Sequence, residues 1–123
     1  MSRSNKNGRR LPFAISYIMF GSRIVGMISY AGAKASDTEV ELHIQLLGEE
    51  RLFSYFKELV ERTFQGFIRY IYVYDVVYAY EVILPLNRPL RNAQGFVKGL
   101  ARQISKDSSG GKTLRKTIER LTK

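Results

Sequence analysis

The sequence predicts a single α+β domain with an antiparallel sheet, and three patterns in its 123 residues carry that prediction. Apolar and polar side chains alternate over 39–46, as they do in a strand with one buried face. Residues 48–64 and 90–105 instead place apolar side chains three and four positions apart, which is the period of an amphipathic helix. The run 67–84 is rich in β-branched and aromatic residues and too long for one strand, so we expect an antiparallel pair there.

The first apolar segment, residues 11–32, is open to two interpretations. Its β-branched and aromatic residues favour a hairpin, with strands at 13–20 and 23–31 and a turn at Gly21-Ser22. Pro12 instead suits the first turn of a helix, where its missing N–H is not needed. A helix over 12–31 would place its small residues about one turn apart, in a seam against which another backbone or a second copy of the chain can pack closely. The seam residues are Ser22, Gly26 and Ser29.

The nonapeptide 24–32 favours the helix, because it resembles the signature helix of the LAGLIDADG homing endonucleases. Its two glycines stand six residues apart, and its apolar residues fill the apolar positions of that family (Ile24, Val25, Met27 and Ile28). The resemblance spans roughly residues 12–105 and implies the element order α-β-α-β-β-α. Where the family carries a metal-binding carboxylate, this sequence has Ala31, whose methyl group offers a divalent metal no oxygen ligand. The resemblance therefore implies the scaffold of a nuclease without its active site.

The later elements follow from local signals. Acidic residues at Glu49 and Glu50 suit the first turn of the helix that Gln65-Gly66 ends. The β-prone run divides near Asp75, and prolines at 85 and 89 stop the sheet. A flexible joint at 108–111 then precedes a short basic helix over 112–122. The predicted organisation is a basic arm (1–10), a core domain (11–106), and a linker with a basic C-terminal helix (107–123).

Charge is sorted along the chain. The formal net charge is +9, yet residues 11–87 hold six basic and nine acidic residues. Residues 1–10 carry four Lys/Arg and no acid, and residues 88–123 carry ten Lys/Arg and two acids. Basic ends on an acidic body are typical of nucleic-acid-binding proteins, because Lys and Arg neutralise phosphates. The candidate contacts are Arg3, Lys6, Arg9, Arg10, Arg88, Arg91, Lys98, Arg102, Lys106, Lys112, Arg115, Lys116 and Arg120.

These observations predict a non-catalytic RNA-binding structural protein of the cytoplasm. We expect it to contact RNA and neighbouring proteins in a ribonucleoprotein, with ribosomal RNA as the first candidate. One alternative is a DNA-binding homing endonuclease or maturase whose metal ligand comes from another position. Another is a viral or archaeal DNA-binding regulator that dimerises through the Gly26 face. Cysteine is absent and His43 is the single histidine, so we expect no catalytic residue, metal site or cofactor.

The tyrosines of the β-prone run have two interpretations. Tyr70, Tyr72 and Tyr74 share one face of a strand and could stack on bases. We favour the other interpretation, in which helices cover them as part of the core. The resemblance implies that DNA is held by the open face of the sheet, but carboxylates on or near that face would repel phosphate. These carboxylates are Glu39, Glu41 and Glu81.

The N-terminal third also has the outline of a membrane-directed segment. A basic stretch (1–10), an apolar stretch (11–20) and small residues at 31–35 follow one another, as they do in a secretory signal peptide. However, Gly21-Ser22-Arg23 interrupts the apolar run, and as a membrane span it would hold Arg23 at the bilayer centre. That position costs about 2.5–3.5 kcal/mol on insertion scales. We therefore expect no membrane association.

Overall fold

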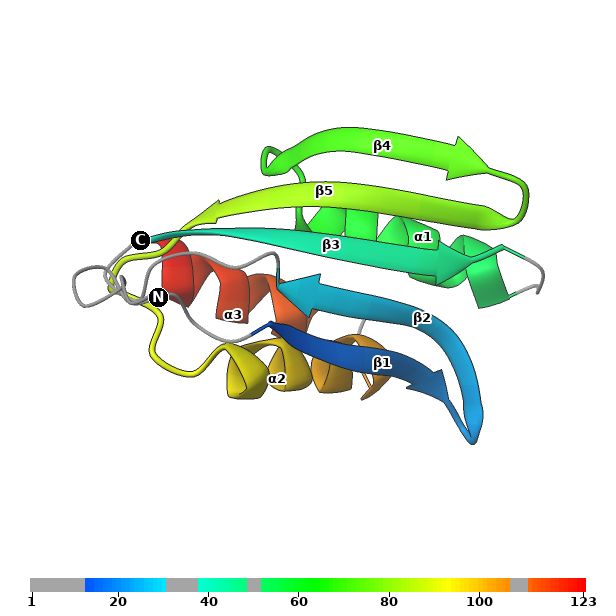
Figure 1. The fold of residues 1–123 in the computed structure, drawn as a ribbon, viewed down its shortest axis with the longest axis horizontal. Coiled ribbons are helices and arrows are strands. Elements are labelled where there is room, and N and C mark those ends of the chain that lie inside the picture. The colour runs from blue at the N-terminus through cyan, green and yellow to red at the C-terminus, as the bar shows by residue number, and fades with distance from the viewer. Residues whose placement is uncertain (1–12, 31–37, 49–51, 107–110) are drawn as a thin grey trace, which may run out of the picture.

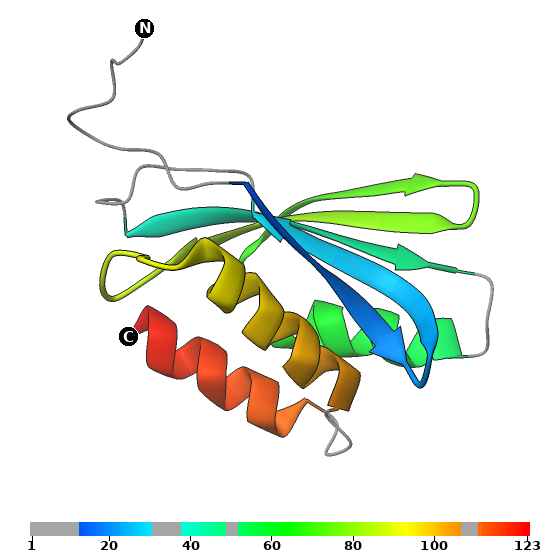
Figure 2. The same cartoon turned by 60° about the horizontal axis from the view of Figure 1, so that its bottom comes forward.

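The protein is described by a computed structural model that covers residues 13–30, 38–48, 52–106 and 111–123. As predicted, the fold is α+β: a five-stranded antiparallel sheet with helices packed on one of its faces (Figures 1 and 2). The strand order is β1-β2-β3-β5-β4, so β1 and β4 are the two edges. The elements are β1 (Ala14–Phe20), β2 (Arg23–Tyr30), β3 (Glu39–Leu47), α1 (Leu52–Thr63), β4 (Ile68–Tyr74), β5 (Val77–Pro85), α2 (Ala93–Lys106) and α3 (Lys112–Thr122).

The predicted helix over 12–31 is wrong, because this segment forms the hairpin β1–β2. Phe20 pairs with Arg23 across a two-residue turn, and Gly21 has φ 64°, in the left-handed region that glycine adopts without steric cost. β-branched and aromatic residues dominate both strands, so their preference for a pleated surface outweighs the helical spacing of the small residues. The element order is therefore β-β-β-α-β-β-α-α, not α-β-α-β-β-α.

The predicted seam of small residues is wrong for the same reason. Ser22 lies in the turn, while Gly26 and Ser29 lie an odd number of residues apart on β2 and so point to opposite faces of the sheet. Gly26 does allow close packing, but inside the sheet: a Cβ there would lie 2.5 Å from the carbonyl oxygen of Gln45 on β3. A dimer through a 12–31 helix is not available to this fold.

Substitution of Gly26 by alanine is expected to lower the free energy of unfolding by about 1–3 kcal/mol, because the added methyl group overpacks the β2–β3 contact. Ser29→Ala is the matched control. The Ser29 hydroxyl is 3.5 Å from the His43 carbonyl oxygen on the exposed face, so its loss should cost little. Urea unfolding of both variants measures the difference. An equal loss of unfolding free energy in the two variants would contradict this placement of β2.

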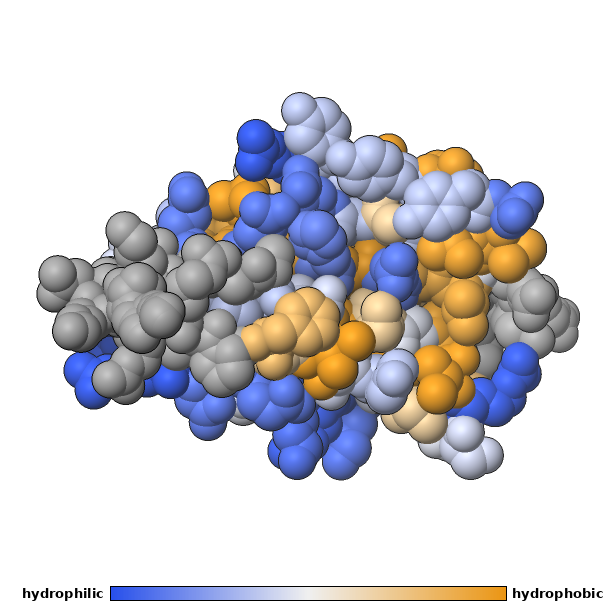
Figure 3. Space-filling model, in the orientation of Figure 1, coloured by the Kyte–Doolittle hydropathy of each residue, from blue (hydrophilic) through white to orange (hydrophobic). Residues whose placement is uncertain are grey.

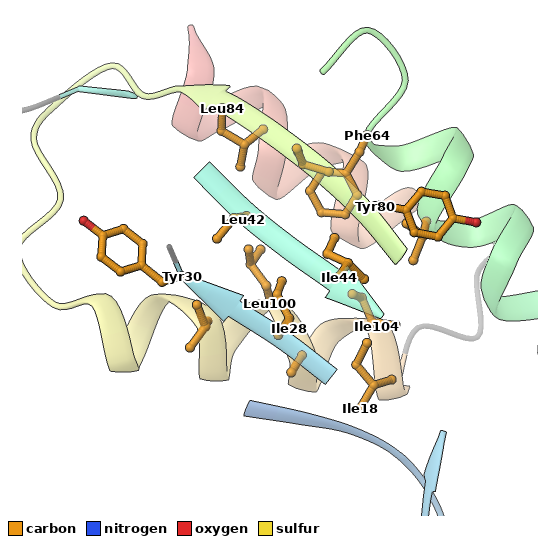
Figure 4. Close-up of a cluster of buried hydrophobic side chains, with 14 of the residues drawn as sticks. Ile18, Ile28, Tyr30, Leu42, Ile44, Phe64, Tyr80, Leu84, Leu100 and Ile104 are labelled. Carbon is orange, nitrogen blue, oxygen red and sulfur yellow. The ribbon is translucent and has the colours of Figure 1, made fainter. Parts of the chain in front are cut away.

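The remaining predicted strands and helices are confirmed, except that α2 begins at Ala93 and not at residue 90; the predicted first turn at Glu49 and Glu50 lies outside the described residues. β3 alternates between buried and exposed residues, with Val40, Leu42, Ile44 and Leu46 facing the core. The 67–84 run forms the hairpin β4–β5, whose two-residue turn begins at Asp75 with φ 52°. β5 lies between β3 and β4, so the chain crosses from β3 through α1 to the outer strand before it returns. Strand and helix side chains then meet in one core, as Figure 4 shows for Ile44, Phe64, Tyr80, Leu100 and Ile104.

The helices α2 and α3 lie side by side and antiparallel under the sheet (Figure 2). Leu114 and Ile118 of α3 belong to the same core cluster as the strands. The end of α3 is held by Asn87, whose backbone N–H donates to the carbonyl of Leu121 (2.6 Å) and whose side-chain amide donates to that of Arg120 (2.6 Å). These bonds satisfy carbonyl groups that a helix end leaves free. α3 is therefore tied to the loop after β5 as well as to the core.

The interpretation of the β4 tyrosines as core residues is wrong. Tyr70, Tyr72 and Tyr74 are 52%, 49% and 52% exposed. The reason is strand order: β4 is the edge strand, and α1 lies behind β3 and β5 (Figure 1). The tyrosines point to the face of the sheet without helices, beside Glu81, Ala79 and Val77 on β5.

Among the helices of the described residues, none is long and apolar enough to cross a lipid bilayer. The segment considered above as a membrane span contains the strands β1 and β2 instead.

Candidate nucleic-acid interface

A stripe of cations runs along one side of α2. Lys98, Arg102 and Lys106 are spaced four residues apart, so they stand one above another on the helix, and all three are exposed. The opposite side of α2 contributes its apolar residues to the core. The amphipathic pattern thus fixes which way the three charges point: away from the core and toward solvent.

This stripe lies beside the edge strand β1. Gln94 donates from Nε2 to the carbonyl oxygen of Ile15 (3.1 Å), and the N–H of Met19 donates to Oγ of Ser105 (2.9 Å). Helix and strand together form a groove of about 260 Å³. Tyr17, 51% exposed, is the aromatic residue of this lining; its register with Met27 directs its side chain to the open face of the sheet, at the β1 edge. The lining residues are Ser16, Tyr17, Met19, Lys98, Arg102, Ser105 and Lys106.

The loop before α2 and the outer side of α3 extend the cationic surface. Lys112, Lys116 and Arg120 repeat every four residues on α3, and all are exposed. Arg115 is exposed as well, as are Arg88 and Arg91 in the loop between β5 and α2. We call the exposed cations of this loop, α2 and α3 the helical basic face. Its members are Arg88, Arg91, Lys98, Arg102, Lys106, Lys112, Arg115, Lys116, Arg120 and Lys123.

The helical basic face has almost no internal neutralisation. Over 86–106 and 111–123, Glu119 is the single acidic residue against ten Lys and Arg. Within the described part of the chain, none of these ten side chains forms an ion pair; the pairs there are made by α1 and by the sheet. Ten cations on the two helices and the loop before α2 favour a polyanion as the binding partner. The predicted contacts Arg3, Lys6, Arg9 and Arg10 lie outside the described residues.

The other face of the sheet has the opposite character. His43 on β3 stands in register with Glu81 on β5, and its Nε2 lies 2.9 Å from Oε2 of Glu41 and 3.7 Å from Oε2 of Glu81. Figure 3 shows hydrophilic surface next to apolar surface on this face. Carboxylates in the middle of the sheet repel phosphate, so the two faces of the molecule differ in the charge of the partner they attract.

Hydrogen bonds set the protonation of this cluster. The hydrogen bond from His43, followed by that from Glu81, lowers the pKa of Glu41. The hydrogen bond to Glu41, followed by partial burial, raises the pKa of Glu81. The three ligand atoms lie within 4.8 Å of one another and are of types that Zn²⁺ accepts. They already bond to each other, and we assign no metal to them.

Substitution of Glu81 by glutamine is expected to raise the melting temperature at pH 7. Because folding raises the pKa of Glu81, its ionisation costs stability, and that cost grows as the pH rises from its usual pKa of 4.5 through the folded value. The gain should therefore shrink as the pH falls toward 4.5. Glu41→Gln should instead lower the melting temperature at pH 7, because the pKa of Glu41 is lowered in the fold. Melting curves at several pH values test this, and pH-independent shifts would contradict it.

The sequence placed Glu41 and Glu81 on or near the open face of the sheet, but it did not predict that they meet at His43. Glu41 and His43 were recognisable as neighbours on one face of a strand, but Glu81 is thirty-eight residues further along the chain than His43. Only the β3–β5 register brings it beside them. The groove at β1 was missed because its strand was predicted as a helix; the exposed aromatic at Tyr17 was the available signal.

No protein-family model matches this chain, and comparisons with curated proteins and with solved structures give no match. The segment that carries the LAGLIDADG resemblance is the strand β2 as far as Tyr30.

Proposed function

We propose that this protein binds RNA without catalysing a reaction, as a structural component of a ribonucleoprotein, with the ribosome as the first candidate. The observation that carries the proposal is the groove between α2 and β1, which Lys98, Arg102 and Lys106 line together with Tyr17 on the edge strand. The rest of the helical basic face extends the surface available to phosphates.

The groove combines two contacts that RNA needs. Side chains four residues apart rise by about 6 Å along a helix, so the three cations on α2 can follow successive phosphates of one strand. The ring of Tyr17 offers a surface on which an unpaired base can stack. Loops, bulges and ends of RNA present such splayed bases, whereas the bases of a duplex are stacked on each other. RNA with single-stranded segments is therefore the favoured ligand.

The groove is suited to binding rather than to proton transfer. Its lining residues supply ammonium, guanidinium, hydroxyl and phenol groups. Among the lining residues that the structure describes there is no carboxylate or imidazole, and those are the side chains that most often serve as general bases. The carboxylates and the histidine of the described sheet lie on its open face, around His43.

Tyr17→Ala is expected to weaken the binding of single-stranded RNA about tenfold, because loss of one base–aromatic stack costs about 1–3 kcal/mol. Tyr17→Phe keeps the ring and should bind nearly as well as the wild type. Fluorescence anisotropy with a labelled RNA measures both affinities. Equal losses for alanine and phenylalanine would assign the effect to the hydroxyl group and contradict stacking.

The proposed function is tested by titrating labelled single-stranded RNA, an RNA hairpin and duplex DNA with the protein over a range of salt concentrations. We expect the RNAs to bind more tightly than duplex DNA, with an affinity that falls steeply with salt. Co-sedimentation with ribosomal subunits, retained at high salt, tests the proposed assembly. Preference for duplex DNA, or magnesium-dependent nicking of a plasmid, would instead support the endonuclease alternative.

A further inference from the structure

The two edges of the sheet are protected differently. At β1, α2 lies alongside the strand and engages its backbone, through Gln94 at the carbonyl of Ile15 and Ser105 at the N–H of Met19. At β4, the described part of the chain provides hydrogen bonds on one side only, to β5. A bare edge strand is a template for pairing with another strand, and proteins normally cover it or charge it.

The outer side of β4 is regular enough to accept such a strand. Tyr74 and Val77 flank the two-residue turn, and the pair that flanks such a turn exchanges hydrogen bonds. By alternation, Tyr70, Tyr72 and Tyr74 direct their N–H and C=O groups to β5. The backbone groups of Ile71 and Val73 therefore point away from the sheet, to the free edge.

The side chains of β4 are exposed on both faces. Ile71 and Val73 are 49% and 56% exposed on the helix side, and the three tyrosines are about half exposed on the other. Val76 in the turn adds a further exposed apolar residue (43%). Figure 3 shows pale and apolar surface along the border where Figure 1 places β4. A continuous apolar strand of this kind marks a protein interface.

We propose that β4 pairs antiparallel with β4 of a second copy of this chain, centred on Tyr72, to form a homodimer with one sheet continuous across both copies. In this register Ile71 lies opposite the partner's Val73, and these residues exchange the hydrogen bonds that the free edge offers. Tyr70 lies opposite the partner's Tyr74. Arg69, at the bulge that begins β4, comes opposite the partner's Asp75.

Self-complementarity selects a second copy as the occupant. The strand has a cation at one end and an anion at the other, so an antiparallel copy places opposite charges together twice. Three tyrosine pairs, one of them Tyr72 with its own copy, and two Ile–Val pairs lie between them. The dimer also leaves no free edge for a third copy. Each copy uses its β4 edge in the pairing, and the two outer edges of the joined sheet are β1 strands, which α2 already engages. A dimer, and not a fibre, is the expected product.

The two-fold axis of such a pair is perpendicular to the sheet, so the helices of both copies lie on the same side. The helical basic faces would then be presented together. The dimer does not depend on RNA, because none of the β4 residues belongs to that face, and it is tested in RNA-free buffer.

Val73→Pro removes the outward N–H without removing a β4–β5 hydrogen bond, and proline is tolerated on edge strands. Val73→Thr is the matched control, since it keeps the N–H and a β-branched side chain. By sedimentation equilibrium, the wild type and Val73→Thr should have twice the 14.1 kDa chain mass. Val73→Pro should raise the dimer dissociation constant about tenfold or more while its melting curve shows a folded protein.

Single cysteines test the register, because the natural sequence has none. In the proposed dimer the two copies of residue 72 form a non-hydrogen-bonded pair, with Cα atoms about 4.5 Å apart, within reach of a disulfide. Tyr72→Cys should therefore cross-link rapidly under mild oxidation. Tyr70→Cys and Tyr74→Cys are equally exposed but should not cross-link alone; mixed together, they should form a heterodimer.

Three results would overturn the proposal. The first is a monomeric wild type over the concentration range of the sedimentation experiment. The second is a Val73→Pro variant as dimeric as Val73→Thr, which would place the interface elsewhere. The third is equal cross-linking of all three cysteine variants, which would indicate random collision and not a fixed register. A tight dimer that binds no RNA would leave this inference intact and contradict the proposed function alone.

Discussion

Reversal of the α2 charges, with Lys98, Arg102 and Lys106 all changed to glutamate, is expected to weaken RNA binding about 100-fold near physiological salt. Each phosphate contact releases a condensed counterion, which contributes about 1 kcal/mol at that ionic strength. Three lost contacts therefore remove about 3 kcal/mol, before any repulsion by the new carboxylates is counted. The three side chains are exposed and lie on the outer side of α2, so the fold should tolerate the change.

The salt dependence identifies the cause. Three fewer neutralised phosphates should lower the slope of log affinity against log salt by about 2–3, because each contact contributes about 0.7–0.9. Anisotropy titrations of wild type and variant at several salt concentrations give both slopes. An affinity loss with an unchanged slope would mean that the substitutions damaged the fold, and no loss would remove α2 from the interface.

Two controls separate position from net charge. Exchange of lysine and arginine at the same three positions keeps the charge and should keep the affinity within a few-fold of wild type. Arg23→Gln combined with Lys57→Gln lowers the net charge at sites outside the helical basic face. Neither side chain lines the groove, so this variant should bind nearly as tightly as the wild type.

Substitution of Leu114 by alanine is expected to lower the free energy of unfolding by about 2–5 kcal/mol. Its side chain is fully buried between α3 and the core, so truncation loses transfer free energy and leaves a cavity. α3 carries half of the helical basic face, and its release should weaken RNA binding as well. Urea unfolding followed by circular dichroism measures the stability.

The control for this prediction is Leu121→Ala on the same helix. Leu121 is only partly buried, so its truncation should cost clearly less. Similar small effects of both substitutions would contradict the packing of α3 on the core. In that case α3 would be a basic helix that does not pack on the core.

Elements with a strong local period could be predicted from the sequence. The alternation in β3 and the three-four spacing in α1 and α2 report directly which side of each element is buried. The same spacing predicted that Lys98 and Arg102 are exposed. The turn at Asp75 was found because a run of that length exceeds an ordinary strand.

The hairpin β1–β2 was mispredicted because two signals compete in it. The spacing of Ser22, Gly26 and Ser29 suits a helix, while the β-branched and aromatic side chains around them suit a strand. Pairing with β3 stabilises the strand conformation of this segment, since Gly26 allows the backbone of Gln45 to approach closely. That contact joins residues nineteen positions apart, and no local pattern encodes it.

Strand order is the second property that the sequence leaves open. The tyrosines of β4 have the composition of a buried strand, yet they are exposed because β5, not β4, lies next to β3. The same order brings Glu81 beside His43 and leaves the β4 edge bare. Both the acidic cluster and the dimer interface that we propose therefore depend on long-range pairing.

The most direct test of RNA binding by the helical basic face is chemical-shift mapping of backbone amides during titration with single-stranded RNA. We expect the perturbed amides to cluster on α2, on the outer side of α3 and around Tyr17, while those around His43 in the middle of the open sheet face stay unchanged. Perturbations centred on His43, or none at all, would contradict RNA binding by the helical basic face.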